Sequence, residues 1–421
     1  MTGQPYPKRD SRKEIVFVRH AESQANADGV WNGRNDGPLS EKGEESLEHL
    51  GRRLRSWDFD AVVSSPLSRA RRTAEAFADD VQIADDLIEI DLGNWEDMSY
   101  ADVLDRHGDE LREALATRTV PMGEVGETIE QAGERAIVAV DRLFHDMGEG
   151  ERIAVVTHGG LMQAILHRHL AGDGRRVHGL VDNTGITRIV EQFGTPRLAS
   201  FNDTGHLGPR PSAVEQHLAD GDTVVALVRH GRTQANLEGR WQGRGDWDLD
   251  ELGHRQAEAL GKWYGRHATV YTSPLKRAAS TAAHVALNGV VPIDDLMEIH
   301  MGDWEGMTTD EISAKWAKDM ERIYRDGVDL PRGTTGETWS QLTQRFSAAI
   351  HALEHQEDDL TVVVAHGGAI RSYVSSLTKT TDTHSQSLFT PANTSVTHIA
   401  MTKRGPEILD FSVSTHLESL V

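Results

Sequence analysis

Short runs of apolar residues alternate along the chain with longer segments in which apolar residues recur at helical spacing. The runs EIVFV, AVV and IAVVT in the first half, and TVVALV and TVVVA in the second, are rich in β-branched residues and predict buried strands. The segment SEKGEESLEHLGRRLRSW places Leu47, Leu50 and Leu54 on one stripe, as expected for a helix packed against a sheet. Strands that alternate with helices predict an α/β fold with a largely parallel sheet.

The pattern occurs twice. VRHAESQAN, which contains His20, returns as VRHGRTQAN, which contains His230, and 12 of the 23 residues from 18–40 match those from 228–250. Four further segments repeat in the same order, at an offset of 208 to 210 residues: SSPLSRARRTAE and TSPLKRAASTAA, DLIEIDLGNWED and DLMEIHMGDWEG, AVVTHGGLM and VVVAHGGAI, DNTGITRIV and ANTSVTHIA. The shared residues are largely Arg, His, Glu, Asn and Gly, which a core does not require, so the repeat preserves more than a fold.

The two copies are separated by FNDTGHLGPRPSAVEQHLADGD, a segment rich in Gly, Pro and Asp that is typical of a linker. A chain of 421 residues is also too long for one ordinary domain. The sequence therefore predicts two tandem domains, 1–211 and 212–421. Each is expected to be a three-layer α/β/α domain with a mostly parallel central sheet.

Composition narrows the class of protein. Asp and Glu outnumber Lys and Arg by 66 to 44, and this net charge of −22 argues against a nucleic-acid or anionic-membrane surface. The chain has no cysteine, so disulfides and thiolate chemistry are excluded. Its polar start lacks the apolar core of a secretory signal, and no apolar run is long enough to span a membrane. We expect a cytoplasmic protein without nucleic-acid or membrane partners; the oligomeric state stays open.

Polar residues with chemical potential follow the predicted strands. Arg19 and His20 end one strand, Ser65 follows a second, His158 follows a third, and Arg69 lies in the next helix. Ligands of open α/β sheets bind beyond the carboxyl ends of the strands, so these residues are expected to converge. Two arginines and two histidines suit a dianion, and the planar guanidinium matches phosphate oxygens. The second half repeats the set as Arg229, His230, Ser273, Arg277 and His366.

These motifs resemble those of the histidine phosphatase superfamily, also called the phosphoglycerate mutase-like family. The family motif R-H-G at the end of the first strand reads Arg19-His20-Ala21 here, and Arg229-His230-Gly231 in the second half. The resemblance covers nearly the whole chain, once in each half. Five ordered motifs in each half make it specific.

The resemblance implies a role for each matching residue. His20 and His230 would be the nucleophiles that form a phosphohistidine. Glu89 and Glu298, the first carboxylates of an E-x-x-x-G-x-W-E pattern, would be the general acids. The second histidines complete the catalytic group, and the remaining matches bind phosphate: His158 and His366; Arg19, Asn26, Arg69, Arg229, Asn236 and Arg277.

The chemistry supports these roles independently. A neutral imidazole nitrogen can attack phosphorus if an acceptor, such as a backbone carbonyl, holds the other nitrogen. Because arginine and histidine supply the positive charge, no metal and no cofactor are expected, and no Walker loop or H-E-x-x-H motif is present. Two alternatives remain open at this point. Asn26 and Asn236 could cap the turn after the strand, and Glu96 or Glu305 could be the acid instead.

The favoured function is hydrolysis of phosphate monoesters of small metabolites, with a catalytic site in each half. The alternatives are a phosphoglycerate mutase-type phosphotransferase, or one catalytic half and one regulatory phosphate-binding half. The segments after the acid motifs look like short helical covers, and they resemble the phosphatase branch of the family more than the longer, cation-rich insertions of the mutases. The first half carries Ala21 and Asp97 where the second has Gly231 and Gly306, so we expect the first half to be the weaker catalyst.

Overall fold

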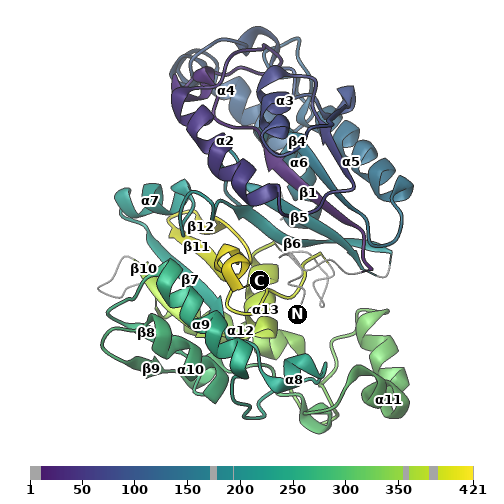
Figure 1. The fold of residues 1–421 in the computed structure, drawn as a ribbon, viewed down its shortest axis with the longest axis vertical. Helices are drawn as coiled ribbons and strands as arrows, with labels where there is room; N and C mark the ends of the chain where they lie inside the picture. Colours follow the sequence, from purple (N-terminus) through teal and green to yellow (C-terminus); the bar gives the residue numbers. More distant parts are fainter. Residues whose placement is uncertain (1–10, 171–177, 193, 354–359, 379–386, 421) are drawn as a thin grey trace. The chain divides into compact units, whose positions relative to one another are not determined.

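The computed structural model describes residues 11–170, 178–192, 194–353, 360–378 and 387–420 (Figure 1). The chain divides into two compact units. The first comprises Met1–His169 and Leu180–Gly208, and the second comprises Leu170–Gly179 and Pro209–Val421. Each unit contains one six-stranded sheet with helices, as the sequence predicted.

The sheet of the first unit has the strand order β3-β2-β4-β1-β5-β6. The first four strands of that order are parallel, and β5 and β6 form an antiparallel edge beside β1. The sequence analysis named the buried strands but not the short β3 or the hairpin β5–β6. The strands are β1 (Glu14–Arg19), β2 (Ala61–Ser64), β3 (Gln82–Ile83), β4 (Arg152–Thr157), β5 (Ile186–Gln192) and β6 (Thr195–Asp203).

Helices cover both faces of this sheet. On one face, Val16 and Val18 of β1 pack with Leu50 and Leu54 of α2 and with Ala70 of α3. Alternate residues of β1 point to the opposite face and are fully buried as well, so a second layer must cover them; Figure 1 shows α5 and α6 there. The helices are α1 (Gln24–Ala27), α2 (Glu41–Leu54), α3 (Ser68–Glu75), α4 (Tyr100–Thr117), α5 (Ile129–Asp146) and α6 (Gly159–Leu170).

The sheet of the second unit has the strand order β12-β11-β7-β10-β8-β9. The strands β7, β10, β8 and β9 are parallel, and β11 and β12 are antiparallel. This order matches that of the first unit position by position, because β7 stands where β1 stands there and β10 where β4 stands. The strands are β7 (Thr223–Arg229), β8 (Val270–Thr272), β9 (Val290–Pro292), β10 (Leu360–Ala365), β11 (Val396–Thr402) and β12 (Gly405–Ile408).

The helices of the second unit repeat the first arrangement with one addition, α7, which packs against β7 and β11. Leu260 of α9 and Ala278 and Ala282 of α10 join the core on one face of the sheet. The helices are α7 (Ser212–Ala219), α8 (Gln234–Leu237), α9 (Glu251–Tyr264), α10 (Lys276–Val285), α11 (Thr309–Tyr324), α12 (Trp339–His351) and α13 (Gly367–Thr378).

Strand register decides what meets at the sheet edge. The last residue of β1, Arg19, pairs with the last residue of β4, Thr157. The residues that follow these two strands, His20 and His158, are therefore neighbours at the carboxyl edge. The register of β7 and β10 is the same, since Arg229 pairs with Ala365.

Candidate active sites

The two predicted histidines of each half lie next to one another. The ring centroids of His20 and His158 are 5.0 Å apart, and those of His230 and His366 are 5.2 Å apart. All four side chains are buried. The prediction that residues distant in sequence converge at the sheet edge is thus met in both halves.

A backbone carbonyl fixes the orientation of the first histidine. Nδ1 of His20 lies 2.7 Å from the carbonyl oxygen of Ala21, and Nδ1 of His230 lies 2.7 Å from that of Gly231. A carbonyl only accepts, so Nδ1 carries the proton and Nε2 keeps its lone pair. Burial and the nearby arginines hold the pKa of His20 and of His230 well below the usual value, which keeps the ring neutral.

A serine orients the second histidine in the opposite sense. Oγ of Ser65 accepts the amide hydrogen of Leu67 at 3.3 Å and lies 2.7 Å from Nε2 of His158. The hydroxyl also has one hydrogen to donate, and in the tautomer of His158 whose Nε2 accepts that hydrogen, the proton of the imidazole is on Nδ1. That Nδ1 atom is buried and has no hydrogen-bond partner. Ser273 and His366 repeat the arrangement at 2.8 Å.

The arginines of the first half are anchored by backbone carbonyls. Nη1 of Arg19 donates to Val181 at 2.6 Å, and its buried Nε has no hydrogen-bond partner. Arg69 is 2% exposed and donates to Gly33 and Asn35 at 2.7 and 2.8 Å. Carbonyls hold these guanidiniums in place without neutralising them, so the site keeps its positive charge.

The arginines of the second half show the same anchoring. Nη1 of Arg229 donates to Pro391 at 2.5 Å, and Arg277 donates to Gly243 and Gly245 at 2.8 and 2.7 Å. Nε of both arginines is buried without a hydrogen-bond partner. Burial lowers the pKa of Arg229 and of Arg277 to about 10, so both stay charged at neutral pH.

The predicted acids lie at the start of the helix that follows the second histidine. Oε2 of Glu89 accepts from the amide of Gly160 at 2.9 Å, and Oε1 accepts from Leu161 at 3.1 Å. The charge of Glu89 opposes the effect of burial on the pKa of both Arg19 and Arg69, which places the carboxylate close to both cations.

The second half places its acid in the same way. Oε2 of Glu298 accepts from the amide of Gly368 at 2.8 Å. A Cβ atom at Gly368 would stand 2.6 Å from Oε1 of Glu298, and one at Gly367 would stand 3.1 Å from Nε of Arg229. The paired glycines of the H-G-G motif therefore leave room for the acid and the arginine side by side.

Asn26 and Asn236 have the capping geometry that the sequence analysis gave as the alternative to phosphate binding. The side chain of Asn26 accepts from the amide of Ser23 at 3.3 Å, and that of Asn236 accepts from Thr233 at 3.1 Å, each as part of a capping box. Asn26 also accepts from Nδ2 of Asn183 at 3.3 Å. A phosphate-binding role for Asn26 and Asn236 stays a prediction.

Three pairs of residues that the sequence analysis did not single out support the site. Nδ2 of Asn183 donates to the carbonyl of His20 at 2.9 Å, and Asn393 donates to His230 at 2.9 Å. Arg135 and Arg345 pair with Glu127 and Glu337 and donate to carbonyls of the segments that lead to the acids. The signal was present, because all these residues recur in both copies of the repeat.

Glu96 and Glu305, the alternative candidates for the acid, bind backbone amides of a loop. Glu96 accepts from the backbone amides of Arg34 and Asn35 at 2.8 and 3.0 Å, and Glu305 accepts from that of Arg244 at 2.9 Å. These carboxylates hold the loop whose carbonyls anchor Arg69 and Arg277. They fit loop support better than proton donation.

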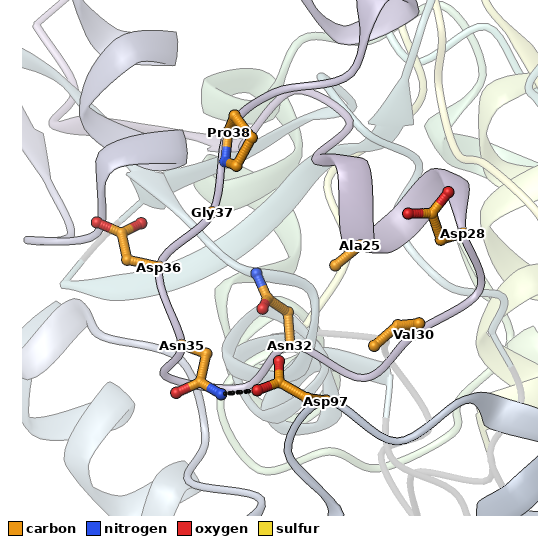
Figure 2. Close-up of a pocket in the computed structure, with 9 residues that line it drawn as sticks. All are labelled: Ala25, Asp28, Val30, Asn32, Asn35, Asp36, Gly37, Pro38 and Asp97. Atoms are coloured by element: carbon orange, nitrogen blue, oxygen red, sulfur yellow. Dashed lines mark hydrogen bonds between the residues drawn. The ribbon is translucent and has the colours of Figure 1, made fainter.

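A surface pocket of the first half adjoins this loop (Figure 2). The side chain of Asn35 donates to Asp97 at 2.6 Å across it. Asp36 lies on the far side of the loop in Figure 2 and accepts from the amide and hydroxyl of Ser68, at the start of α3. The pocket is lined by Ala25, Asp28, Val30, Asn32, Asn35, Asp36, Gly37, Pro38 and Asp97.

Two features of the described residues bear on other functions. No group of three or more His, Cys, Asp or Glu side chains is arranged to hold a metal ion among them. Within the same ranges, no helix has the length and apolar character needed to cross a membrane.

Comparison with known proteins gives a consistent picture. The profile of the histidine phosphatase superfamily (branch 1) matches residues 15–204 and again 225–414. A metal-independent phosphoserine phosphatase of Arabidopsis thaliana is 34% identical over 158 residues, 36% of this chain and 66% of that protein. A 2-carboxy-D-arabinitol-1-phosphatase of Triticum aestivum is 25% identical over 386 residues, 86% of this chain and 77% of that protein.

A solved structure is similar to one half. The phosphoserine phosphatase of Entamoeba histolytica, determined as a mutant in complex with phosphoserine, is 29% identical, with a TM-score of 0.41. The match covers 46% of this chain and 99% of that one. The two profile matches together span most of the sequence, in the order and with the motifs described above. The chain therefore belongs to the histidine phosphatase superfamily, with two family domains in tandem.

Proposed function

We propose that each half hydrolyses phosphate monoesters of small metabolites through a phosphohistidine. One observation carries the proposal: a buried, neutral histidine with Nε2 unprotonated lies among buried nitrogen donors that have no hydrogen-bond partner. In the first half these donors are Nε of Arg19 and, in the tautomer in which Ser65 donates to Nε2, Nδ1 of His158. Such donors are costly unless an anion binds them, and a tetrahedral dianion offers several acceptor oxygens.

In the first step, Nε2 of His20 or His230 attacks phosphorus with its lone pair. The N–P bond forms as the P–O bond to the leaving group breaks, and the electron pair departs with that oxygen. Glu89 or Glu298, in its acid form, donates a proton to the leaving oxygen, so an alcohol is released. The arginines and the second histidine donate to the equatorial oxygens, where charge is spread in the transition state.

In the second step, water attacks the phosphohistidine. The same glutamate, now a carboxylate, takes a proton from the water, and the N–P bond breaks with its electron pair returning to Nε2. Inorganic phosphate leaves, and His20 or His230 is again a neutral imidazole. No step requires a metal, since Arg and His side chains supply the positive charge. We also propose that the reaction takes place in the cytoplasm.

The names of two relatives point to a class of substrate. Phosphoserine and 2-carboxyarabinitol 1-phosphate are small phosphate monoesters that also carry a carboxylate. We infer that this chain acts on small phosphorylated metabolites of that general kind. The helices α4 and α11 follow the acid motifs directly, as short covers of a phosphatase would.

A panel of phosphorylated metabolites incubated with the purified protein tests the proposal. Release of inorganic phosphate from at least one of them is expected, and EDTA should not abolish it. The products should be examined for phosphoryl transfer as well as release. Movement of the phosphoryl group to another hydroxyl without phosphate release would favour the mutase instead. If neither phosphate release nor phosphoryl transfer occurs, catalysis is refuted.

A further inference from the structure

The second half carries an additional cation beside its site. Arg371 lies one helical turn after Gly367 in α13, so the two residues share a face of that helix. Gly367 borders Arg229, as its Cβ position lies 3.1 Å from Nε of that arginine. The charge of Arg371 contributes to the lowered pKa of Arg229, after burial and Arg277. Arg371 is thus a close neighbour of the phosphate-binding arginines.

Two neighbours position the guanidinium of Arg371. Its centre lies 4.9 Å from the ring centroid of Trp339, at the first position of α12, in the range of a cation–π contact. Nη1 donates to Oγ1 of Thr390 at 3.3 Å. The next residue, Pro391, holds Arg229 through its carbonyl. One short segment therefore anchors both arginines, which keeps their charges together.

The first half has none of these three residues. The repeat places Gln163 where the second half has Arg371, Ile129 where it has Trp339, and Leu180 where it has Thr390. The residues that hold the phosphate are the same in both halves, so three changes in one contact group mark a local difference. Clustering like charges is unfavourable by itself, and an anion placed between them offsets that cost.

We propose that Arg371 binds a second anionic group of the substrate, a carboxylate or a second phosphate, in the site of the second half. The first half lacks this contact and discriminates less between substrates with and without that group. The assignment rests on the proposed phosphate-monoester chemistry of the same site. Trp339 and Thr390 contact the guanidinium, so we assign them as positioning residues.

Matched substrates test the proposal. 3-Phosphoglycerate and glycerol 3-phosphate differ by one carboxylate, and fructose 1,6-bisphosphate and fructose 6-phosphate differ by one phosphate. His20→Ala with Arg69→Ala disables the first site, so the ratio of kcat/KM within each pair reports the second site alone. Arg371→Gln should lower the preference for the member with the extra anionic group about 10-fold or more in one pair, mainly through KM. The pair affected shows whether a carboxylate or a phosphate is bound.

Two control variants separate binding from structure. Arg371→Lys keeps the charge but loses the planar fork, so an intermediate ratio is expected. Lys262→Gln removes an exposed cation of α9 and should leave the ratio unchanged. An equal loss for both members of each pair, or no change in either ratio, would overturn the proposal.

A binding measurement keeps the proposal independent of turnover. Adding His230→Ala to the background with the first site disabled removes the proposed nucleophile. Calorimetric titration with the same four compounds then gives the affinity ratios directly. If Arg371→Gln lowers an affinity ratio although the native protein hydrolyses no compound of the metabolite panel, the proposed hydrolysis fails and the anion site stands. Unchanged affinity ratios would reject the anion site whatever the turnover.

Discussion

The two halves agree where the phosphate would bind and differ around it. His20 and His230 contact the following carbonyl at the same distance of 2.7 Å, and the paired rings are 5.0 and 5.2 Å apart. Each of these groups has several buried partners, so a change at one would disturb the others. The agreement indicates that the geometry of the paired histidines is the same in both halves, whereas the residues around them differ.

We call the loop residues beside each site the rim, and several of them differ together between the halves. They are Asn35, Gly37 and Asp97 in the first half and Gly245, Trp247 and Gly306 in the second. In the second half the ring of Trp247 lies 3.0 Å from the Cβ position of Gly245 and 3.9 Å from that of Gly306. The first half has Gly37, Asn35 and Asp97 at these places. Two glycines thus make room for a tryptophan in the second half. In the first, a hydrogen bond between Asn35 and Asp97 and the open pocket of Figure 2 occupy the same region.

The residue after the proposed nucleophile is Ala21 in the first half and Gly231 in the second, and backbone conformation does not explain this difference. Gly231 does not adopt a left-handed conformation, but a Cβ atom on it would stand 2.7 Å from the carbonyl oxygen of Gly253 in α9. Close approach of two backbone segments therefore explains the glycine. The first half accommodates Ala21, which is fully buried.

Removal of His20 and His230 should have the largest effect on turnover. His20→Ala and His230→Ala together should lower turnover on the order of 1000-fold or more, since the nucleophile is lost at both sites. His230→Ala alone should cost more of the total rate than His20→Ala. Initial rates of the three variants give the result. Near-full activity in the double variant would refute both sites, and a larger loss from His20→Ala would reverse the ranking.

The glutamates test whether both halves protonate the leaving group. In the Glu89→Gln/Glu298→Gln variant, burst-phase phosphorylation by an alkyl phosphate should slow roughly 100- to 10000-fold. Phosphorylation by p-nitrophenyl phosphate should slow far less, because that leaving group needs no proton.

The burst phase is required because loss of the base for water would slow dephosphorylation equally for both substrates. Gln also offers one acceptor oxygen where Glu89 uses two, so local packing is disturbed. That disturbance affects both substrates alike. Equal burst losses would mean that these glutamates are not the acids.

Stability against pH should respond to the buried histidines of both halves. The pKa of His20, His158, His230 and His366 is lowered chiefly by burial, so the unfolded chain binds protons below about pH 6.5 that the folded chain refuses. Stability should fall with decreasing pH, by up to about 1.4 kcal/mol per pH unit for each histidine.

Denaturant unfolding between pH 7.5 and 5.5 measures this slope. His158→Gln and His366→Gln should each reduce it, because each removes one group that titrates only in the unfolded chain. A slope that the substitutions leave unchanged would mean that these histidines bind protons equally in the folded and the unfolded chain.

Exchanging the residue after the proposed nucleophile tests how closely the backbone approaches it in each half. Gly231→Ala should cost about 1–3 kcal/mol and lower turnover of the second half, because the methyl group meets Gly253. Ala21→Gly is the matched control, with an expected cost of about 1 kcal/mol and little change in the site. Thermal unfolding and rates in single-site backgrounds measure both. A neutral Gly231→Ala would show that α9 is free to shift.

The smallest effect is expected at the rim. Asp97 has a φ of 64°, a left-handed conformation that costs a non-glycine residue, whereas Gly306 has a φ of 75° at no such cost. Asp97→Gly should stabilise the first half by about 1 kcal/mol at most, because loss of the hydrogen bond to Asn35 offsets part of the gain. Gly306→Asp should destabilise the second half. If unfolding experiments show that Asp97→Gly destabilises the protein and Gly306→Asp stabilises it, backbone strain does not explain the difference.

Much of the fold and the convergence of the site could be predicted from the sequence. Repeated runs of β-branched residues predicted the sheet. The stripe of Leu47, Leu50 and Leu54 predicted a helix packed against it. The edge hairpins could not be seen, since β5 and β6 mix polar residues with apolar ones. Arg135 and Arg345 recur at matching positions of the repeat, and this recurrence was their one sequence signal. Their role was missed because bonds from an arginine to backbone carbonyls leave no motif that assigns a function.

The proposed mechanism forms a covalent intermediate at Nε2 of the first histidine in both halves. The most direct measurement is to quench the protein during turnover of a labelled phosphate monoester and to locate the label by peptide mapping. We predict an acid-labile, base-stable phosphate on His20 and on His230. An acid-stable label on a serine or threonine, or no label at either histidine, would contradict the account.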